Sequence, residues 1–129
     1  MTLLSILKSK IHRATVTDCC IDYVGSVGID EDLMERTALQ PNERVHVWNV
    51  TNGARLETYV IPCPRKSGII SLNGAAAHHA KVGDKVIIAS FCLTDTPAKP
   101  KMVLVDENNR FTSWLDSEPP LTALEADRG

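Results

Sequence analysis

The hydrophobic and polar positions of the chain follow the two-residue period of β-strands over much of its length. Residues 9–17 alternate polar side chains with apolar or small ones and include several β-branched residues, which is typical of a half-buried strand. The same period places Lys10 and His12 on one face of that strand. Residues 23–29 form a second expected strand, which contains the adjacent pair Gly25 and Ser26.

A short helix is expected directly after this second strand. Asp30 is a favourable N-cap residue, and the acidic residues that follow it suit the first turn of a helix because they interact favourably with the helix dipole. Leu33 and Ala38 lie at helical spacing, and Pro41 prevents the helix from continuing. These signals predict a helix over residues 31–39.

A hairpin is the clearest local feature of the sequence. Residues 44–50 and 55–61 are rich in β-branched and aromatic side chains, and they flank the pair Asn52 and Gly53, which favours a tight primed turn. In the second arm, alternation predicts two opposite faces. They consist of Arg55, Glu57 and Tyr59 on one side and Leu56, Thr58 and Val60 on the other.

The second half of the chain adds three further expected strands, at residues 69–72, 85–91 and 101–106. Between the first two, residues 73–79 are mostly small, which suits either a close backbone approach to a ligand or a tight turn into a short helix. The tail over residues 115–129 contains paired prolines and charges, and we expect it to be mobile.

Six to eight short strands with two small helices and frequent turns favour a mainly β fold, a small β-barrel, as a single domain over residues 1–129. Of the residues, 43% are hydrophobic and 23% charged, which is ordinary for a globular chain of this length. No apolar run approaches the ~20 residues of a membrane helix, and residues 1–8 lack the order of a signal peptide. We therefore expect a cytoplasmic protein without a membrane partner.

The charge and the metal-binding residue types exclude two further classes of function. A net charge of −2 with interspersed signs disfavours nucleic-acid binding. The cysteines make no Cys-x-x-Cys pair, and adjacent His78 and His79 lack the spacing that places two ligands on one helical face. We expect reduced, mostly buried thiols and no bound metal. The cysteines are Cys19, Cys20, Cys63 and Cys92.

The peptide bond between Gly25 and Ser26 is the candidate reactive centre. The carbonyl before Ser26 is unhindered, and the serine hydroxyl could attack it because glycine permits such an approach. Taken alone, a Gly-Ser pair between apolar stretches more often marks a bend or bulge in a strand. The surrounding sequence has to decide between these interpretations.

Six blocks of sequence, in their order and spacing, resemble the family of pyruvoyl-dependent L-aspartate 1-decarboxylases. They are SKIHR at residues 9–13, YVGS at 23–26, WNVTNGAR at 48–55, TY at 58–59, NGAAAH at 73–78 and VIIASF at 86–91. The resemblance extends from about residue 7 to residue 110. It implies a six-stranded double-psi β-barrel and a homotetramer with active sites between subunits. It also implies production of β-alanine from L-aspartate for pantothenate and coenzyme A.

Decarboxylation of an amino acid itself requires the kind of cofactor that the resemblance implies. Decarboxylation of an α-amino acid leaves a carbanion that ordinary side chains do not stabilise, so an electron sink conjugated through a Schiff base is required. The chain is too short for a usual pyridoxal-phosphate fold and has no glycine-rich phosphate loop. The resemblance implies that Ser26 attacks the Gly25 carbonyl, and that elimination and hydrolysis leave a pyruvoyl group at Ser26. The zymogen would thus separate by autocatalytic cleavage into residues 1–25 and 26–129, without pyridoxal phosphate or metal.

The resemblance also implies roles for individual residues. Thr58 would donate a hydrogen bond to the Gly25 carbonyl during cleavage, and Tyr59 would be the proton donor after carbon dioxide leaves. Arg55 would bind a substrate carboxylate. The remaining substrate contacts would come from Thr58, Lys10, His12, Asn73, Gly74, Ala75 and Ala76, of which Asn73 orients the pyruvoyl end and the three small residues offer backbone amides.

Two alternatives belong to other classes of function. A serine hydrolase using Ser26 is disfavoured, because the sequence around it lacks the Gly-x-Ser-x-Gly spacing of a nucleophile elbow. A non-enzymatic β-barrel used for binding or assembly is the stronger rival, because this architecture is not tied to one activity.

Overall fold

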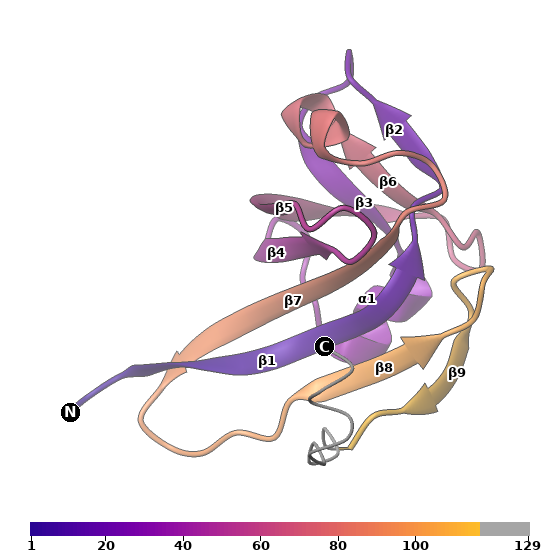
Figure 1. Ribbon diagram of the computed structural model, residues 1–129. Coiled ribbons are helices and arrows are strands. Elements are labelled where there is room, and N and C mark those ends of the chain that lie inside the picture. The colour runs from indigo at the N-terminus through magenta and orange to yellow at the C-terminus, as the bar shows by residue number, and fades with distance from the viewer. Residues whose placement is uncertain (117–129) are drawn as a thin grey trace, which may run out of the picture.

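Strands dominate the structure, a computed structural model that describes residues 1–116 (Figure 1). The strands are β1 (Leu4–Thr15), β2 (Asp18–Cys20), β3 (Ser26–Asp30), β4 (Arg44–Asn49), β5 (Arg55–Cys63), β6 (Ile70–Asn73), β7 (Lys85–Thr94), β8 (Lys101–Val105) and β9 (Phe111–Trp114). One α-helix, α1 (Glu31–Thr37), and one 3₁₀-helix, η1 (Gly74–His79), complete the described elements.

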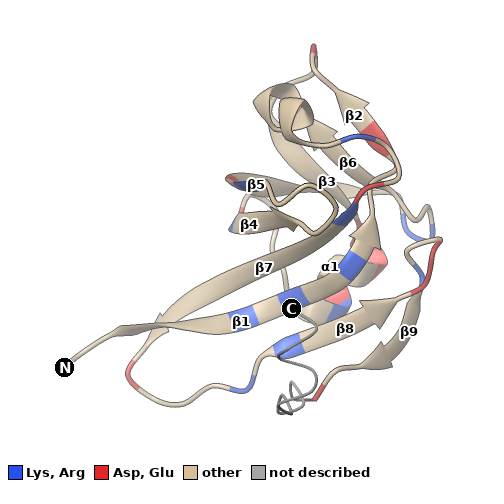
Figure 2. Cartoon of the chain, in the orientation of Figure 1, with Lys and Arg blue, Asp and Glu red and all other residues tan. Residues whose placement is uncertain are grey.

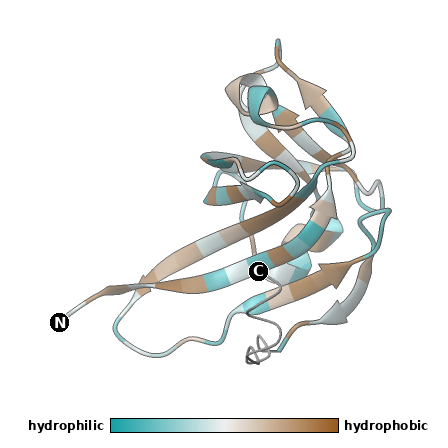
Figure 3. Ribbon diagram, in the orientation of Figure 1, coloured by the Kyte–Doolittle hydropathy of each residue, from teal (hydrophilic) through white to brown (hydrophobic). Residues whose placement is uncertain are grey.

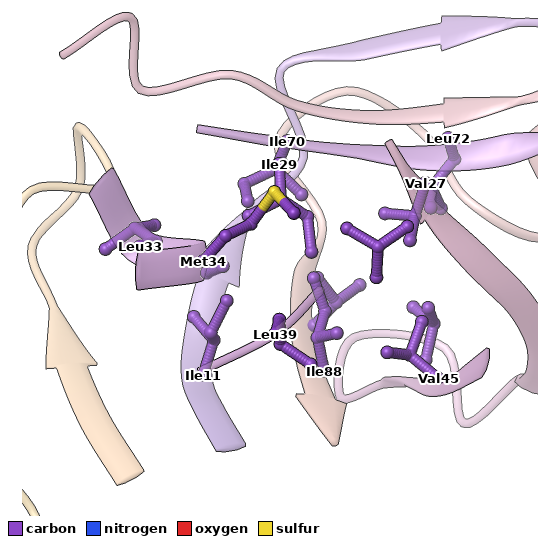
Figure 4. Packing of buried hydrophobic residues seen from close by; sticks show 14 of the residues in the cluster. Ile11, Val27, Ile29, Leu33, Met34, Leu39, Val45, Ile70, Leu72 and Ile88 are labelled. Atoms are coloured by element: carbon purple, nitrogen blue, oxygen red, sulfur yellow. The ribbon is translucent and has the colours of Figure 1, made fainter. Parts of the chain in front are cut away.

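The strands form one curled sheet in the order β2-β6-β3-β5-β4-β7-β1-β8-β9. Most neighbours are antiparallel, but β1 with β8, β2 with β6 and β3 with β5 are parallel. Ile70 of β6 and Ile11 of β1 stand far apart in this order, yet they belong to one buried cluster (Figure 4). Val103 of β8 belongs to the same cluster. The sheet therefore wraps around a single core, and the expected mainly β small barrel is confirmed.

The predicted helix forms where its capping signal indicated. The Asp30 side chain accepts a hydrogen bond from the backbone amide of Asp32 at 2.9 Å, and Leu33 and Met34 pack into the core (Figure 4). The helix ends at Thr37, slightly earlier than expected, because Ala38 adopts a left-handed conformation with φ of 60°.

The predicted hairpin is also confirmed, with β4 and β5 antiparallel and Gly53 at a positive φ of 81° in the turn. Alternation in β5 is as expected. Leu56, Thr58 and Val60 are partly or fully buried, whereas Arg55, Glu57 and Tyr59 are exposed.

The strands differ from the sequence prediction mainly at their ends. The strand expected from residue 23 begins only at Ser26, because its ladder with β6 starts at the pair Ser26 and Asn73. β1 begins at Leu4 rather than residue 9, because it follows the whole length of β7. The three-residue β2 and β9 bring the total within residues 1–116 to nine strands, more than the six to eight expected.

Charge and hydropathy are distributed as the sequence suggested. Basic and acidic positions are interspersed along the elements (Figure 2), and hydrophobic positions concentrate on strands (Figure 3). No helix among residues 1–116 is long and apolar enough to cross a membrane. The expected mobile tail, residues 115–129, lies outside the described residues except at its start, where Leu115 donates a backbone hydrogen bond to Met102 at 2.9 Å.

Candidate active site

The peptide bond between Gly25 and Ser26 lies at the beginning of β3, where the strand meets the end of β6. Ser26 is 1% exposed and stands opposite Asn73 in the antiparallel ladder. Asn73 Nδ2 donates a hydrogen bond to Ser26 Oγ at 3.0 Å. Asn73 Oδ1 in turn accepts one from Ser71 Oγ at 2.7 Å. A chain of three polar side chains therefore ends on the candidate nucleophile.

Gly74 brings the start of η1 against the backbone of the candidate cleavage site. Its φ is 64°, and a Cβ at this position would lie 2.8 Å from Gly25 Cα and 3.1 Å from the Tyr23 carbonyl oxygen. Only glycine combines this backbone conformation with such an approach. Gly25 differs, because a Cβ built there would meet no atom within 4 Å.

A small pocket adjoins Gly25. Its lining residues come from the start of β3, from β5 and from the region of β6 and η1. They are Gly25, Leu56, Glu57, Thr58, Asn73, Ala75, Ala76 and His79. The fold thus assembles Gly25, Thr58, Asn73 and two of the small residues predicted for the site around one space. Ser26 and Gly74 follow the lining residues Gly25 and Asn73 directly in the chain.

The remaining predicted site residues do not line this pocket in the described chain. Tyr59 points to the other face of β5, is 37% exposed and stands opposite Arg44 of β4. The Arg55 guanidinium carbon lies 4.7 Å from the centre of the Trp48 ring. Lys10 and His12 lie on β1, four places from β3 in the sheet order. The predicted site is therefore divided between two regions of one chain.

The block WNVTNGAR supports the wall of the pocket through its turn. Asn49 Oδ1 accepts backbone hydrogen bonds from Thr51 at 2.9 Å and Asn52 at 3.2 Å. The side-chain amides of Asn49 and Asn52 donate to the His79 carbonyl oxygen at 3.3 Å and 3.0 Å. The turn between β4 and β5 therefore holds the end of η1, the element that carries Ala75 and Ala76.

Cys63 contacts the same region, but as a packing group. Its sulfur lies 2.7 Å from the position that a Gly28 Cβ would occupy, so the missing side chain of Gly28 makes room for it. Burial raises the pKa of the Cys63 thiol, and the charges of Asp18 and Asp30 act in the same direction. Cys63 is therefore a poor nucleophile beside Ser26.

The four cysteines are free thiols, but the expectation that they are mostly buried is wrong. Cys20 is exposed, and Cys19, Cys63 and Cys92 are half-buried. Cys19 and Cys20 lie on the short edge strand β2, Cys63 is the last residue of β5, and Cys92 lies in the partly exposed end of β7. Within residues 1–116, no cluster of three or more His, Cys, Asp or Glu side chains is arranged to hold a metal ion.

Ser71 and His79 are site residues that the sequence reasoning missed. The spacing of Ser71 and Asn73 is the signal that was available, because residues two apart in a strand share a face. His79 lines the pocket, and nothing in the spacing of the adjacent histidines indicates that role.

Comparison with known proteins assigns this sequence to a family. A profile described as aspartate decarboxylase matches residues 2–112. A protein of Carboxydothermus hydrogenoformans is 52% identical over 119 residues, covering 89% of this chain and 94% of the relative. A protein of Leptothrix cholodnii is 56% identical over 119 residues, covering 89% and 90%. One of Stenotrophomonas maltophilia is 49% identical over 124 residues, covering 93% and 98%. All three are named Aspartate 1-decarboxylase. The chain belongs to the aspartate decarboxylase family.

Proposed function

We propose that the protein is a carboxy-lyase that converts L-aspartate to β-alanine and carbon dioxide, in the supply of pantothenate and coenzyme A. Its similarity to proteins named Aspartate 1-decarboxylase over most of its length supports the reaction. One structural observation carries the proposal. The buried Ser26 hydroxyl is held by Asn73 at 3.0 Å, next to a glycine that opens on a pocket lined by Thr58.

The active protein arises by self-cleavage between Gly25 and Ser26. Ser26 Oγ attacks the Gly25 carbonyl carbon, so that a C–O bond forms, the peptide C–N bond breaks and the hydroxyl proton passes to the released amine of Ser26. The resulting ester loses the Ser26 α-proton and the Gly25 carboxylate by β-elimination. Hydrolysis of the remaining dehydroalanine with one water releases ammonia and leaves a pyruvoyl group on residues 26–129. Residues 1–25 end in the Gly25 carboxylate.

Thr58 stabilises the first step. When the serine oxygen attacks, negative charge develops on the Gly25 carbonyl oxygen, and a hydroxyl on the wall of the pocket can donate to it. Thr58 and Gly25 line the same pocket. A well-placed donor of this kind lowers the barrier by roughly 3 kcal/mol.

The residues around Ser26 fit a pyruvoyl group. The cofactor replaces the Ser26 side chain and amine with a compact ketone, and the Asn73 amide that reaches Ser26 Oγ can donate to that ketone oxygen. When formed, the group withdraws electrons from the bond to the departing carboxylate. Pyridoxal phosphate and a metal are not required.

The chain's own residues bind and orient L-aspartate. The backbone amides of Gly74, Ala75 and Ala76 face the substrate, while Asn73 fixes the end at Ser26. The planar guanidinium of Arg55 suits a carboxylate.

Lys10 and His12 assist from the opposite side of the site, and Tyr59 donates a proton to the substrate α-carbon after carbon dioxide leaves. Thr58 completes the set of substrate contacts.

A homotetramer with active sites between subunits reconciles these roles with the fold. Lys10, His12, Arg55 and Tyr59 do not line the pocket beside Gly25 in the described chain, so a neighbouring copy has to bring some of them to it. We further propose that this assembly works in the cytoplasm without a nucleic-acid or membrane partner.

Intact-mass analysis tests the proposal. The purified protein should separate under denaturing conditions into residues 1–25 and 26–129, with the larger chain lighter by one ammonia than a chain beginning with serine. Ser26→Ala should remain a single folded chain without β-alanine production. A folded, fully uncleaved wild-type protein after prolonged warming would overturn the proposed function.

A further inference from the structure

Ser71 lies on the face of β6 that meets the candidate cleavage site. In the antiparallel ladder Ser71 stands opposite Gly28 and Asn73 stands opposite Ser26, so the four positions form a small square on the sheet. The Ser71 hydroxyl donates to Asn73 Oδ1 at 2.7 Å, and Asn73 Nδ2 donates to Ser26 Oγ at 3.0 Å. Asn73 is 4% exposed and Ser26 is 1% exposed.

We propose that Ser71 is a positioning residue for the maturation of Ser26, acting through the side-chain amide of Asn73. This inference rests on the proposed self-cleavage and adds to it a residue that does not touch the reacting atoms. Ser71 holds the Asn73 amide in place, and the amide donates to the Ser26 hydroxyl.

The orientation matters because an asparagine amide has a donor end and an acceptor end of nearly equal shape. With Nδ2 toward Ser26, the amide donates into a lone pair of Oγ. The hydroxyl proton of Ser26 is then free to leave, and negative charge that builds on Oγ is stabilised. With Oδ1 toward Ser26, the amide would accept that proton's hydrogen bond and hold it on the serine. The structure has the first orientation, and the hydrogen bond from Ser71 to Oδ1 holds the amide in place behind Ser26.

The side chain next to Ser71 provides a matched control. Cys63 Sγ fills the space above Gly28, where a built Cβ would lie 2.7 Å from the sulfur and 3.5 Å from Ser71 Cβ. Cys63 therefore packs on the same patch of sheet. Removing its sulfur alters packing around Ser71 while leaving the hydrogen bond from Ser71 to Asn73 in place.

The size of the effect follows from the hydrogen bond that is lost. Without Ser71 Oγ, the Asn73 amide loses one neutral hydrogen bond in a partly buried setting. The cleavage rate should then fall about three- to tenfold, the range expected for such a bond. A threonine at this position keeps the hydroxyl and suits a strand, so it should restore cleavage.

The experiment follows cleavage of freshly made precursor. Wild type, Ser71→Ala, Ser71→Thr and Cys63→Ala are synthesised in a cell-free system, synthesis is stopped, and the fraction of residues 26–129 is measured by intact mass over time. The same substitutions in a Ser26→Ala background, where no variant is cleaved, give their effects on thermal unfolding. We expect slow cleavage for Ser71→Ala alone, with near-normal rates for Ser71→Thr and Cys63→Ala and similar melting temperatures for all.

Two results would overturn the positioning role while leaving the proposed function intact. One is cleavage of Ser71→Ala at the wild-type rate. The other is equal slowing by Cys63→Ala and Ser71→Ala, which would assign the effect to packing. An uncleaved wild-type protein would instead overturn the proposed function, and the role of Ser71 with it.

Discussion

Thr58 and Tyr59 are neighbours in β5, but their side chains serve opposite faces of the sheet. Thr58 lines the pocket beside Gly25 and stands opposite Val45 in the ladder. Tyr59 is 37% exposed on the other face and stands opposite Arg44. Of these two residues, only Thr58 lines the pocket beside the bond between Gly25 and Ser26 in the same chain.

This arrangement predicts that substitution of Thr58 impairs cleavage, whereas substitution of Tyr59 impairs turnover of L-aspartate. Thr58→Val keeps the shape of the side chain but removes the proposed donor to the Gly25 carbonyl, so cleavage should slow by about 100-fold or more, as for loss of an oxyanion donor. Tyr59→Phe should cleave normally, yet produce β-alanine about 100-fold more slowly, because it lacks the proposed proton donor. Intact mass measures the first effect and β-alanine production by fully cleaved protein the second.

Equal cleavage defects in the two variants would refute this division of roles. Wild-type turnover by cleaved Tyr59→Phe would remove Tyr59 from the proton transfer, whatever the outcome for Thr58.

Alanine substitutions at the neighbouring Gly74 and Gly25 should differ in their effect on stability. Gly74→Ala forces a Cβ to within 2.8 Å of Gly25 Cα at a positive φ. It should therefore lower the free energy of unfolding by about 1–3 kcal/mol. Gly25→Ala places its Cβ in open space and should change stability by less than about 0.5 kcal/mol. Denaturant unfolding in a Ser26→Ala background compares them without cleavage, and equal losses would contradict the packing described.

The ion pair between Lys8 and Glu43 predicts a pH dependence of stability. Burial acts to raise the pKa of Glu43, but the backbone amide of Gln40 and the Lys8 ammonium outweigh it, so the pKa is lowered from its ordinary value of 4.5. Lys8 Nζ lies 2.9 Å from Glu43 Oε2 and also donates to the Ala38 carbonyl at 2.7 Å.

A carboxyl group whose pKa is lowered by folding stabilises the protein at pH values above its pKa in the unfolded state. This stabilisation is lost as the pH falls through its pKa in the folded state. Glu43→Gln should therefore cost about 1 kcal/mol at pH 7, and the difference from wild type should shrink below about pH 4. Unfolding free energies measured from pH 7 down to pH 3 check this. A difference that stays constant with pH would mean that the Glu43 charge is not responsible.

Local signals predicted most of the fold. The cap at Asp30 and the Asn52–Gly53 turn act within a few residues, so the sequence was sufficient to locate them. Strand ends depend on partners elsewhere in the chain. Ser26 begins β3 because Asn73 stands opposite it, and three residues at 18–20 form a strand because β6 lies beside them. No local pattern contains that information.

The candidate site shows the same limit. Alternation predicted the face of Thr58 and of Tyr59 correctly, because a face depends only on the strand's own period. It did not predict that Lys10 and His12 lie four strands from Ser26. Which strands are neighbours is a property of the topology, and in this family the resemblance supplied residue roles without supplying their separation within one chain.

The Gly25–Ser26 bond lies between β2 and β3, so the proposed cleavage would divide one fold between two separate chains. Residues 1–25 contribute β1, whose ladders run along β7 and β8, and β2, which pairs with β6. They also place Ile11, Ala14 and Val16 in the core, at 0%, 0% and 1% exposure. The proposed cleavage would therefore give a tight heterodimer of the two fragments. Unfolding would release two separate molecules, so that each protomer would recover its fold only by reassociation of its fragments, which depends on protein concentration. The protomer of the intact precursor needs no such reassociation to fold.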